Sequence, residues 1–399
     1  MAETPREEMR TVILRRGAEK RVNLGHLWVF SNEVQEFDRS IPPGEDVAVR
    51  TLRGDLVGTG TWSPSSLISV RLHARGREAA LGPELIAERV GAAWAARLAW
   101  FGAEAAACRV VYAEGDGLPG LVVDRFGEHL SVQCLTAAME RRVEWVLDAL
   151  DKVLAPRGIV LRNDSPAREL EGLPRAVSLG RREVPERAPF ALHGLKLQAD
   201  LWEGQKTGFF FDQRENYGLL RPLAPGARVL DAFCYSGAWG LHARHWGARE
   251  VVFVDASAKA LELVRENLVA NDFGWAELVR SDVVDLLKVS AGRGGGFDVA
   301  VLDPPAFAKS KARAKEALKG YLNLNKWGMR CVKPGGYLVT CSCSHHVPPE
   351  VFVEMAALAA REAGREVRVL GTGRQASDHP WIPAMPETAY LKVLLLRVL

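Results

Sequence analysis

The sequence predicts an α/β protein whose C-terminal part is a doubly wound, mostly parallel sheet, preceded by a small β-rich domain and an α+β middle domain. Three observations support this fold class. From about residue 196 onward, continuously apolar strand-like runs alternate with helical patterns, as in parallel sheets covered on both faces. Residues 1–75 read as short strands, and residues 76–195 mix helices with strands. At 399 residues, the chain is too long for one ordinary domain.

The composition is that of a folded protein. Hydrophobic residues make up 48% of the chain and charged residues 25%, and the formal net charge is +3, so binding to nucleic acid would require local basic patches. The N-terminal MAETPREEMR has no apolar run typical of a signal peptide, and no apolar stretch approaches the roughly 20 residues of a membrane helix. The six cysteines are scattered, and several lie in apolar runs, as free thiols usually do. We therefore expect a cytoplasmic multidomain protein.

Residues 1–75 are expected to form a small β-rich module. Four runs have strand character and are separated by turns such as IPPGE and RGD: TVILRR, EDVAVRT, LVGTGTWS and LISVRLHA. Basic residues gather in the first 25 positions, next to Trp28 and Phe30: Arg10, Arg15, Arg16, Lys20 and Arg21. Composition alone favours a solvated charged surface for this cluster, and an RNA-binding surface is the functional alternative.

Residues 76–195 are expected to form an α+β domain. The segment opens with the helical pattern GPELIAERVGAAWAARLAWF, followed by two strand-like runs within RVVYAEGDGLPGLVVDRFGEHLSVQCL. A second helix, AMERRVEWVLDALDKVL, precedes the strand GIVLRND. The acidic residues of AEGDG could be catalytic, but turn formation explains Asp116-Gly117 well enough.

Residues 196–399 have the most regular pattern. The expected strands are ARVLDAFC, EVVFVDAS, AELVRSD, FDVAVLDPP and GYLVTCSCS. The expected helices between them are GAWGLHARHWG, AKALELVRENLVAND, a run beginning DLLKVS, and AKEALKGYLNLNKWGMRCV. In such a sheet ligands bind beyond the carboxyl ends of the strands, so the polar residues at these ends are the candidates for a site.

Acids at these strand ends indicate a cofactor site. The turn DAFCYSGAWG contains Gly237 and Gly240, which alone do not make the dinucleotide fingerprint. Asp255, at the end of VVFVDAS, can accept hydrogen bonds from ribose hydroxyls, and Asp282, in VRSD, can meet an adenine amino group. A ribose and an adenine without a pyrophosphate favour S-adenosylmethionine over NAD. A helix N-cap is the better explanation of any one acid, whereas three acids in register are harder to dismiss.

The last two predicted parallel strands end in residues that suit catalysis. Asp303 precedes two prolines in LDPPAF, and their fixed φ keeps the turn rigid. In VTCSCSHHV, Cys341 and Cys343 point to one face of the strand. A zinc site with His345 or His346 lacks the usual Cys-x₂₋₄-Cys spacing, and a redox pair would more commonly be Cys-x-x-Cys. Buried packing suits Cys341, inside the strand, whereas a nucleophile suits Cys343, where the strand ends.

A cysteine beside S-adenosylmethionine makes chemical sense when the carbon to be methylated is unreactive. C5 of cytosine is such a carbon, because attack of thiolate on C6 turns the ring into an enamine whose C5 can take the methyl group. A carboxylate near N3 and N4 stabilises positive charge during this attack. Cys343 as nucleophile and Asp303 as that carboxylate meet both requirements. The sequence does not identify the base that removes the C5 proton.

A series of motifs carries a family resemblance from about residue 10 to the C-terminus. The motifs are HLWVFSNEV, WSPSSLI, EGDGLPGLVVDRFG, GQKTGFFFDQREN, DAFCYSGAWG, VVFVDAS, VLDPPAF, SCSHH and RQASDHP. In this order they resemble the PUA-domain class I S-adenosylmethionine-dependent methyltransferases that make 5-methylcytidine in large-subunit (23S) ribosomal RNA. The resemblance implies a PUA-like RNA-binding domain over residues 1–75, a middle domain for RNA recognition over 76–195, and a methyltransferase domain over 196–399.

The resemblance also implies site residues. The methionine part of the cofactor would be surrounded by Asp231, Phe233, Tyr235, Ser236 and Gly237. Asp255 would hold the ribose and Asp282 the adenine, with Ser257 and Asp303 also in the cofactor site. The rim of the same pocket would be formed by Asp212, Gln213 and Arg214. Cys343 stands at the position of the family's nucleophile.

The chain departs from related enzymes at one point. Some RNA cytosine-C5 methyltransferases carry a second cysteine after the proline of the fourth-strand motif, thought to help product release, whereas this chain reads DPPA there. Release would then work in another way. Cys341, two residues before the nucleophile position, is interpreted as packing.

Two other classes of function compete with this interpretation. A guanine-N methyltransferase shares some of these motifs but needs no cysteine, and an RNA-binding or ribosome assembly protein would not need the acids and the cysteine together. An NAD-dependent oxidoreductase is disfavoured because this chain lacks the phosphate-binding glycines.

The expected partner is 23S rRNA, naked or in an assembling subunit. It would be bound through its phosphates, with contributions from Arg10, Arg15, Arg16 and Lys20. A homodimer is compatible with the sequence, which does not determine the oligomeric state.

Overall fold

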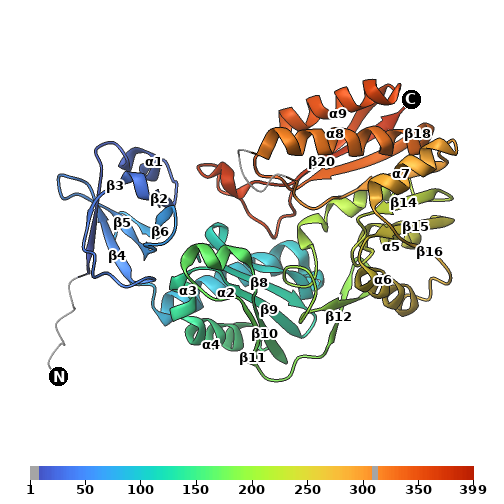
Figure 1. Ribbon diagram of the computed structural model, residues 1–399. Coiled ribbons are helices and arrows are strands. Elements are labelled where there is room, and N and C mark those ends of the chain that lie inside the picture. Colours follow the sequence, from blue (N-terminus) through green and yellow to red (C-terminus); the bar gives the residue numbers. More distant parts are fainter. Residues whose placement is uncertain (1–8, 308–312) are drawn as a thin grey trace. The chain divides into compact units, whose positions relative to one another are not determined.

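The computed structural model of the chain describes residues 9–307 and 313–399, which divide into two units (Figure 1). Unit 1 contains the chain up to Ala188 together with Asp200–Phe209 and Asp378–Thr388. Unit 2 contains Pro189–Ala199, Phe210–Ser377 and Ala389–Leu399. The division into three consecutive domains, with boundaries near residues 75 and 195, stays a prediction.

The N-terminal sheet of unit 1 is formed by short strands around helix α1 (Glu19–Asn23). Its strands are β1 (Thr11–Leu14), β2 (Trp28–Phe30), β3 (Val34–Phe37), β4 (Asp46–Arg50), β5 (Leu56–Trp62) and β6 (Ile68–Arg75). They lie in the order β2-β6-β5-β4-β1-β3, with β1 and β4 parallel and the other neighbours antiparallel. The predicted β-rich module is confirmed, and β2 and β3 are additional short strands.

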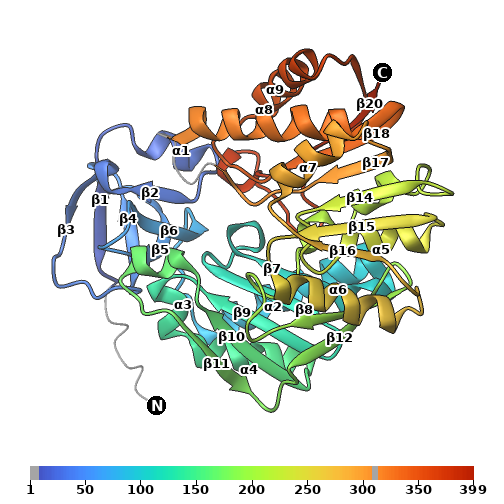
Figure 2. The same ribbon diagram turned by 45° about the vertical axis from the view of Figure 1, so that its right-hand side comes forward.

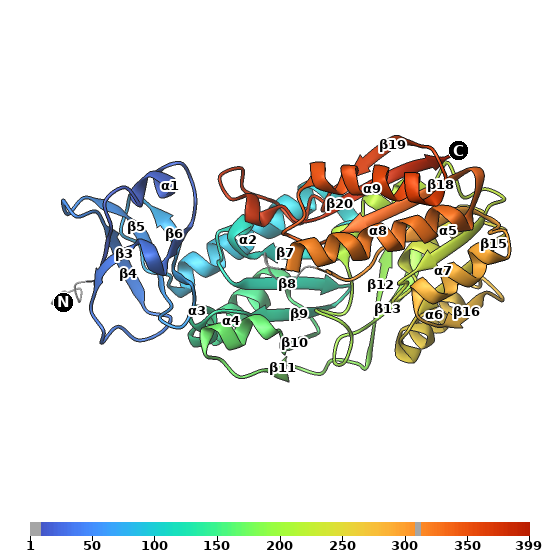
Figure 3. The same cartoon turned by 45° about the horizontal axis from the view of Figure 1, so that its top comes forward.

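The second sheet of unit 1 has five strands and packs against helices α2 (Pro83–Phe101) and α4 (Val143–Leu154) (Figure 3). Its strands are β7 (Ala107–Tyr112), β8 (Leu121–Phe126), β9 (His129–Cys134), β10 (Gly158–Asn163) and β11 (Ala176–Arg181), in the order β11-β10-β9-β8-β7. Strands β9 and β10 are parallel, and the crossover between them contains α3 (Ala137–Arg141) and α4, as parallel pairing requires.

Three sequence predictions for this region are corrected by the structure. The two expected strand runs after α2 are three strands, because the turn at Gly127 separates β8 from β9. The expected helix over residues 138–154 is interrupted at Arg142, whose guanidinium donates to the carbonyls of Gly44 and Leu81. Strand β11 was not expected, because Val177 and Leu179 in this edge strand are exposed and produce no buried pattern.

A two-stranded hairpin, β12 (Arg187–Leu192) and β13 (Leu195–Asp200), precedes the large sheet in the chain. Its strands alternate buried and more exposed residues, which is typical of sheets with one covered face. The turn consists of His193 and Gly194, both with φ in the left-handed region (51° and 82°), as two-residue hairpin turns require. The sequence analysis did not identify this hairpin.

Unit 2 is organised around a seven-stranded sheet (Figure 2). Its strands are β14 (Arg228–Ala232), β15 (Glu250–Asp255), β16 (Glu277–Arg280), β17 (Phe297–Leu302), β18 (Val332–Ser342), β19 (Val367–Gly373) and β20 (Lys392–Val398). Their order is β16-β15-β14-β17-β18-β20-β19; the first five are parallel, and β20 is antiparallel to β18 and β19. The doubly wound prediction is confirmed, and the direction of winding reverses between β14 and β17.

Helices cover both faces of this sheet. They are α5 (Ala238–His245), α6 (Ala258–Ala270), α7 (Val283–Gly292), α8 (Ala314–Cys331) and α9 (Pro349–Ala363). Val252 and Val254 of β15 belong to the core on the face of α7, α8 and α9, whereas Val251 and Phe253 face α5. This alternation explains the continuously apolar run, since successive side chains of one strand point to opposite, equally buried faces. No helix in the described ranges is long and apolar enough to cross a membrane.

The close approach of α5 to β15 predicts a specific destabilisation. A Cβ added at Gly240 would lie 2.3 Å from the Phe253 ring, so we expect Gly240→Ala to lower the free energy of unfolding by about 1–3 kcal/mol through overpacking. Urea unfolding followed by circular dichroism measures this change. The matched control is Gly218→Ala, because nothing lies within 4 Å of its added Cβ. Equal stability of the two variants would contradict this packing.

Candidate active site

Polar residues of unit 2 meet at the carboxyl ends of β14 and β17, where the winding of the sheet reverses. Ala232 pairs with Leu302, so Asp231 and Asp303 occupy neighbouring strand ends. The backbone N–H of Asp303 also donates to the carbonyl of Ala232 at 3.4 Å. This point is where open α/β sheets bind ligands.

The carboxylate of Asp303 is oriented by neutral donors. Both of its oxygens lie 3.1 Å from Nε2 of Gln213, and Oδ2 also accepts a hydrogen bond from the indole N–H of Trp239 at 3.1 Å. The Gln213 amide is itself fixed, since its Oε1 accepts from Asn216 at 2.7 Å. These two donors carry no charge, and together they fix the direction of the carboxylate.

The two cysteines of the SCS segment have different environments. Cys341 is fully buried within β18, and burial raises the pKa of its thiol well above the ordinary value. Cys343 follows the last residue of β18 and is partly exposed, with its Sγ 4.0 Å from the carbonyl of Pro304. The other four cysteines of the chain are buried. Cys343 is therefore the thiol that a solute can reach, and it lies beside the proline turn that follows Asp303.

The loop from β14 to α5 is shaped by residues with positive φ. Phe233, Tyr235 and Gly237 have φ values of 62°, 45° and 81°, a conformation that costs non-glycine residues free energy and that clusters at functional sites. The backbone N–H of Tyr235 donates to Oδ2 of Asp255 at 3.1 Å, so the carboxylate at the end of β15 holds this loop. Ser236, between them, is buried.

Asp255 and Asp282 both make local contacts. Oδ1 of Asp255 accepts a hydrogen bond from the backbone of Ser257 at 2.8 Å, and the Ser257 hydroxyl caps α6. Asp282 is exposed and caps α7 by accepting from the backbone of Asp285 at 3.1 Å. The N-cap interpretation is therefore correct for Asp282. Its predicted contact with adenine would use the remaining acceptor capacity of the carboxylate.

Asp231 is a fully buried carboxyl group at the end of β14. Its Oδ2 accepts a hydrogen bond from the backbone of Gly240 at 2.8 Å, which joins β14 to the first turn of α5. Burial raises the pKa of Asp231 to about 7; the Gly240 hydrogen bond opposes this, and the charges of Asp303 and Asp255 add to it. The site therefore places three carboxyl groups near one another, which favours a ligand that carries positive charge.

The FFFDQR segment is buried rather than exposed at a rim. Asp212, Gln213 and Arg214 are each at most 5% exposed. Oδ2 of Asp212 accepts from the hydroxyl of Tyr390 at 2.6 Å, and its carbonyl accepts from the backbone of Ala376 at 2.9 Å. Gln213, the middle residue of the three, orients Asp303.

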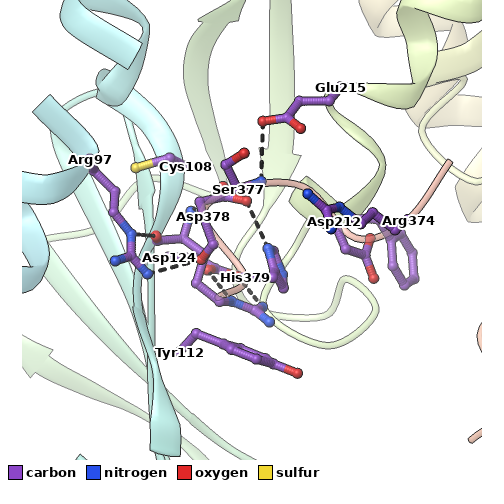
Figure 4. Close-up of polar contacts among 12 residues, drawn as sticks. Arg97, Cys108, Tyr112, Asp124, Asp212, Glu215, Arg374, Ser377, Asp378 and His379 are labelled. Atoms are coloured by element: carbon purple, nitrogen blue, oxygen red, sulfur yellow. Dashed lines mark hydrogen bonds and ion pairs between the residues drawn. The ribbon is translucent and has the colours of Figure 1, made fainter. Parts of the chain in front are cut away.

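The RQASDHP segment makes specific contacts in each unit. In unit 2, the backbone N–H of Ser377 donates to Glu215 at 3.1 Å. In unit 1, the buried carboxylate of Asp378 lies 2.7 Å from Nδ1 of His379, and its backbone carbonyl accepts from Arg97 (Figure 4). These contacts are made by consecutive residues in the middle of the segment.

The AEGDG turn also has a role that the sequence did not reveal. Gly117 has φ of 71°, as turn chemistry predicts, but the Asp116 carboxylate additionally forms a bidentate ion pair with Arg97 at 2.6 and 2.7 Å. Both side chains are buried. Because Arg97 also donates to Asp378, the turn supports the RQASDHP segment within unit 1.

The four predicted RNA-binding side chains are exposed in the N-terminal module of unit 1, three of them flanking β1 and one in α1: Arg10, Arg15, Arg16 and Lys20. Arg10 donates to the hydroxyl of Ser40 and Arg15 to the carbonyl of Val34. Two members of the cluster make ion pairs: Arg21 with Glu33 at 2.6 Å, and Arg10 with Asp38 at 3.9 Å. The exposed members remain available to a polyanion.

Two residues at the site were missed by the sequence analysis. Trp239 contacts Asp303, and its position in the first turn of α5 gave no signal apart from its aromatic side chain. Lys392 is 9% exposed, and its ammonium donates to the carbonyls of Ser344 and Tyr390. A lone lysine in the apolar run of residues 391–396 was a signal that could have been recognised.

Comparisons with known proteins agree with this architecture. The family models that match are a PUA-like domain over residues 12–75 and "Conserved hypothetical protein 95" over residues 212–370. The chain is 36% identical over 394 residues to "Ribosomal RNA large subunit methyltransferase I" of Tolumonas auensis, covering 98% of this chain and 99% of that protein. The protein of the same name from Shewanella amazonensis is 38% identical over 390 residues, covering 96% and 98%.

Solved structures share the fold over nearly the whole chain. A structure described as a SAM-dependent methyltransferase from Streptococcus mutans has a TM-score of 0.83 at 20% identity, covering 98% of this chain and all of that one. Another, described as a methyltransferase complexed with S-adenosylhomocysteine, has a TM-score of 0.84 at 20% identity and the same coverage. These two likenesses establish the fold.

The buried carboxyl of Asp231 predicts a dependence of stability on pH. Its pKa is about 7 in the folded protein and near the ordinary value of 3.8 in the unfolded chain, so the wild type loses stability as pH rises from 4 to 7. The variant Asp231→Asn does not titrate at this position. Its free energy of unfolding, relative to that of the wild type, should therefore increase over this range by about 1.4 kcal/mol for each unit of difference between the folded and unfolded pKa of Asp231. Urea unfolding without cofactor at pH 4.5 and pH 8 measures the gain. The control is Asp285→Asn, which removes an exposed carboxylate. If the free energy of unfolding of Asp231→Asn differed from that of the wild type by the same amount at both pH values, the prediction would be contradicted.

Proposed function

The chain belongs to the ribosomal RNA large subunit methyltransferase I family, and we propose that it transfers a methyl group from S-adenosylmethionine to C5 of a cytosine in 23S rRNA. Membership of this family makes the protein an S-adenosylmethionine-dependent ribosomal RNA methyltransferase. The observation that carries the choice of cytosine C5 is Cys343, a partly exposed thiol at the end of β18 beside the turn that follows Asp303. The substrate would place the enzyme in the cytoplasm.

The residues at the strand ends fit the cofactor. When bound, S-adenosylmethionine supplies an electrophilic methyl group on a cationic sulfur. The buried and half-buried carboxyl groups of Asp231, Asp255 and Asp303 suit a ligand that carries positive charge. Asp255 would hold the ribose, and the left-handed loop of Phe233 and Tyr235 would lie around the methionine part.

Cys343 acts as the nucleophile in this proposal. Its thiolate adds to C6 of the cytosine, forming an S–C6 bond and moving the C5–C6 electron pair to C5, which takes the methyl group. A base removes the C5 proton, the S–C6 bond breaks, and the thiolate is regenerated. A guanine-N methyltransferase would attack through a ring or exocyclic nitrogen and would have no use for this thiol.

Asp303 supports the addition electrostatically. A carboxylate opposite N3 and the N4 amino group stabilises the positive charge that the ring acquires during the attack on C6. Gln213 and Trp239 hold this carboxylate in one direction before substrate arrives, so little reorganisation is needed. Trp239 and Gln213 are therefore positioning residues for Asp303.

The N-terminal module supplies RNA affinity in this proposal. The PUA-like domain carries exposed basic side chains, which would neutralise phosphates of a structured region of 23S rRNA, naked or in an assembling subunit. The methylated cytosine would have to leave its stack, because both the thiol and the methyl donor need access to the ring.

We expect Cys343→Ala to abolish the formation of 5-methylcytidine, because no other partly exposed thiol exists in the chain. Purified protein is incubated with isotope-labelled S-adenosylmethionine and unmodified large-subunit rRNA, and the labelled nucleoside is identified after digestion. The matched control is Cys341→Ala, two residues earlier and fully buried, which should keep the product. RNA containing 5-fluorocytosine should trap the covalent adduct with the wild type and with Cys341→Ala, but not with Cys343→Ala. Methylated guanosine from both variants would refute the proposal.

Affinity for RNA should fall steeply with salt. Replacing the four exposed basic residues by Gln should weaken binding at 50 mM salt by at least about tenfold and reduce the slope of log K against log salt by about 0.7–0.9 per lost phosphate contact. These residues are Arg10, Arg15, Arg16 and Lys20. Filter binding over 50–300 mM salt measures the slope. The control replaces Arg265 and Lys288, exposed on α6 and α7, and an equal loss there would contradict a specific role for the N-terminal cluster.

A further inference from the structure

Lys392 is a buried amine that lies beside the end of β18, the strand that leads to Cys343. It begins β20 and pairs in the antiparallel ladder with Ser342, the last residue of β18. Its Nζ donates to the carbonyl of Ser344 at 2.6 Å and to that of Tyr390 at 2.8 Å. The ammonium therefore lies against the backbone on the C-terminal side of Cys343.

The surroundings of Lys392 do not supply a carboxylate. Both acceptors are carbonyl oxygens, and no carboxylate within residues 9–307 and 313–399 forms an ion pair with it. Burying an ammonium without a counterion is costly, so the arrangement needs a reason. Two of its three N–H donors are used by the carbonyls, which leaves one N–H for a further acceptor.

Burial lowers the pKa of Lys392 to about 8, and the charge of Cys343 opposes this effect by raising it. Such an interaction is reciprocal, since a thiolate that stabilises an ammonium is itself stabilised by the same amount. At neutral pH most of Lys392 is protonated. The cation is therefore present in the pH range where a cysteine nucleophile has to ionise.

Two neutral groups and one carboxylate also lie near Cys343 in the described part of the chain. Tyr321 of α8 and Cys341 of β18 interact with it, and burial raises the pKa of both, which keeps them neutral. Asp303, at the end of β17, acts on Cys341 and is negative, so it disfavours a nearby thiolate. His345 and His346, next in the chain, have exposed side chains.

We propose that Lys392 is a positioning residue whose buried ammonium fixes the backbone after Cys343 and stabilises the Cys343 thiolate. The proton of the thiol goes to solvent, and Lys392 keeps its own. The benefit of this thiolate for catalysis rests on the proposed cytosine methylation. The effect of Lys392 on the ionisation of the thiol does not depend on that reaction. The stabilisation is lost as pH rises through about 8 and the ammonium deprotonates.

The test measures the rate of alkylation of Cys343 by iodoacetamide against pH, with the modified residue identified by mass spectrometry. The buried state of the other five cysteines makes the reaction selective in the native protein. For Lys392→Met and Lys392→Gln we expect the midpoint of the profile to rise by about one unit, which is about tenfold slower alkylation below both midpoints. Lys392→Arg should stay near the wild type. Gln keeps an N–H donor for the carbonyls, so a shift in both neutral variants assigns the effect to charge.

The matched control is Lys333→Met, which removes an exposed lysine near the other end of β18 and should leave the profile unchanged. If Lys392→Met is unfolded by circular dichroism, the Gln and Arg variants decide. An unchanged midpoint in Lys392→Gln would overturn the inference, even if Cys343→Ala lacks 5-methylcytidine and the proposed function holds. A raised midpoint in protein that makes no 5-methylcytidine would support the inference about the thiol and reject the proposed reaction.

Discussion

The pairing of β14 with β17 is the constraint on which the site depends. These neighbouring parallel strands are far apart in the chain, and the direction of winding reverses between them. Helices leaving the two strands diverge from this point, so the carboxyl ends are left uncovered by secondary structure. Asp231 and Asp303 lie at these ends, and β18 brings Cys343 to the next position along the sheet edge.

The site combines buried charge with neutral supports. Asp303 accepts hydrogen bonds from the amide of Gln213 and the indole of Trp239, and Asp231 accepts one from a backbone N–H. Such an arrangement costs stability in the free protein, because carboxylates in apolar surroundings resist ionisation. A cationic ligand would relieve this cost, which explains how stability and ligand binding can be linked at one position.

In each unit, several contacts join residues that are far apart in the sequence. Tyr390, near the C-terminus, donates to Asp212, which lies almost 180 residues earlier. Lys392 reaches back to the segment after β18 because β20 runs antiparallel to it. In unit 1, Arg97 joins Asp116 to the backbone of Asp378. Local sequence patterns carry no trace of such contacts, so they could be found only once the chain was folded.

The sequence by itself determined the class of fold and the residues at the strand ends. Continuous apolar runs predicted the parallel sheet because both of its faces are buried, and the end of each run located Asp255, Asp303 and Cys343. It did not predict β11, whose side chains are exposed, or the break at Arg142, which depends on carbonyls of distant residues. The positions of Cys341 and Cys343 in the strand predicted that the first is buried and the second is accessible, as observed, but only the tertiary structure placed Lys392 against the backbone that follows Cys343. Burial and charge pairing are properties of neighbours in space, which periodicity along the chain does not encode.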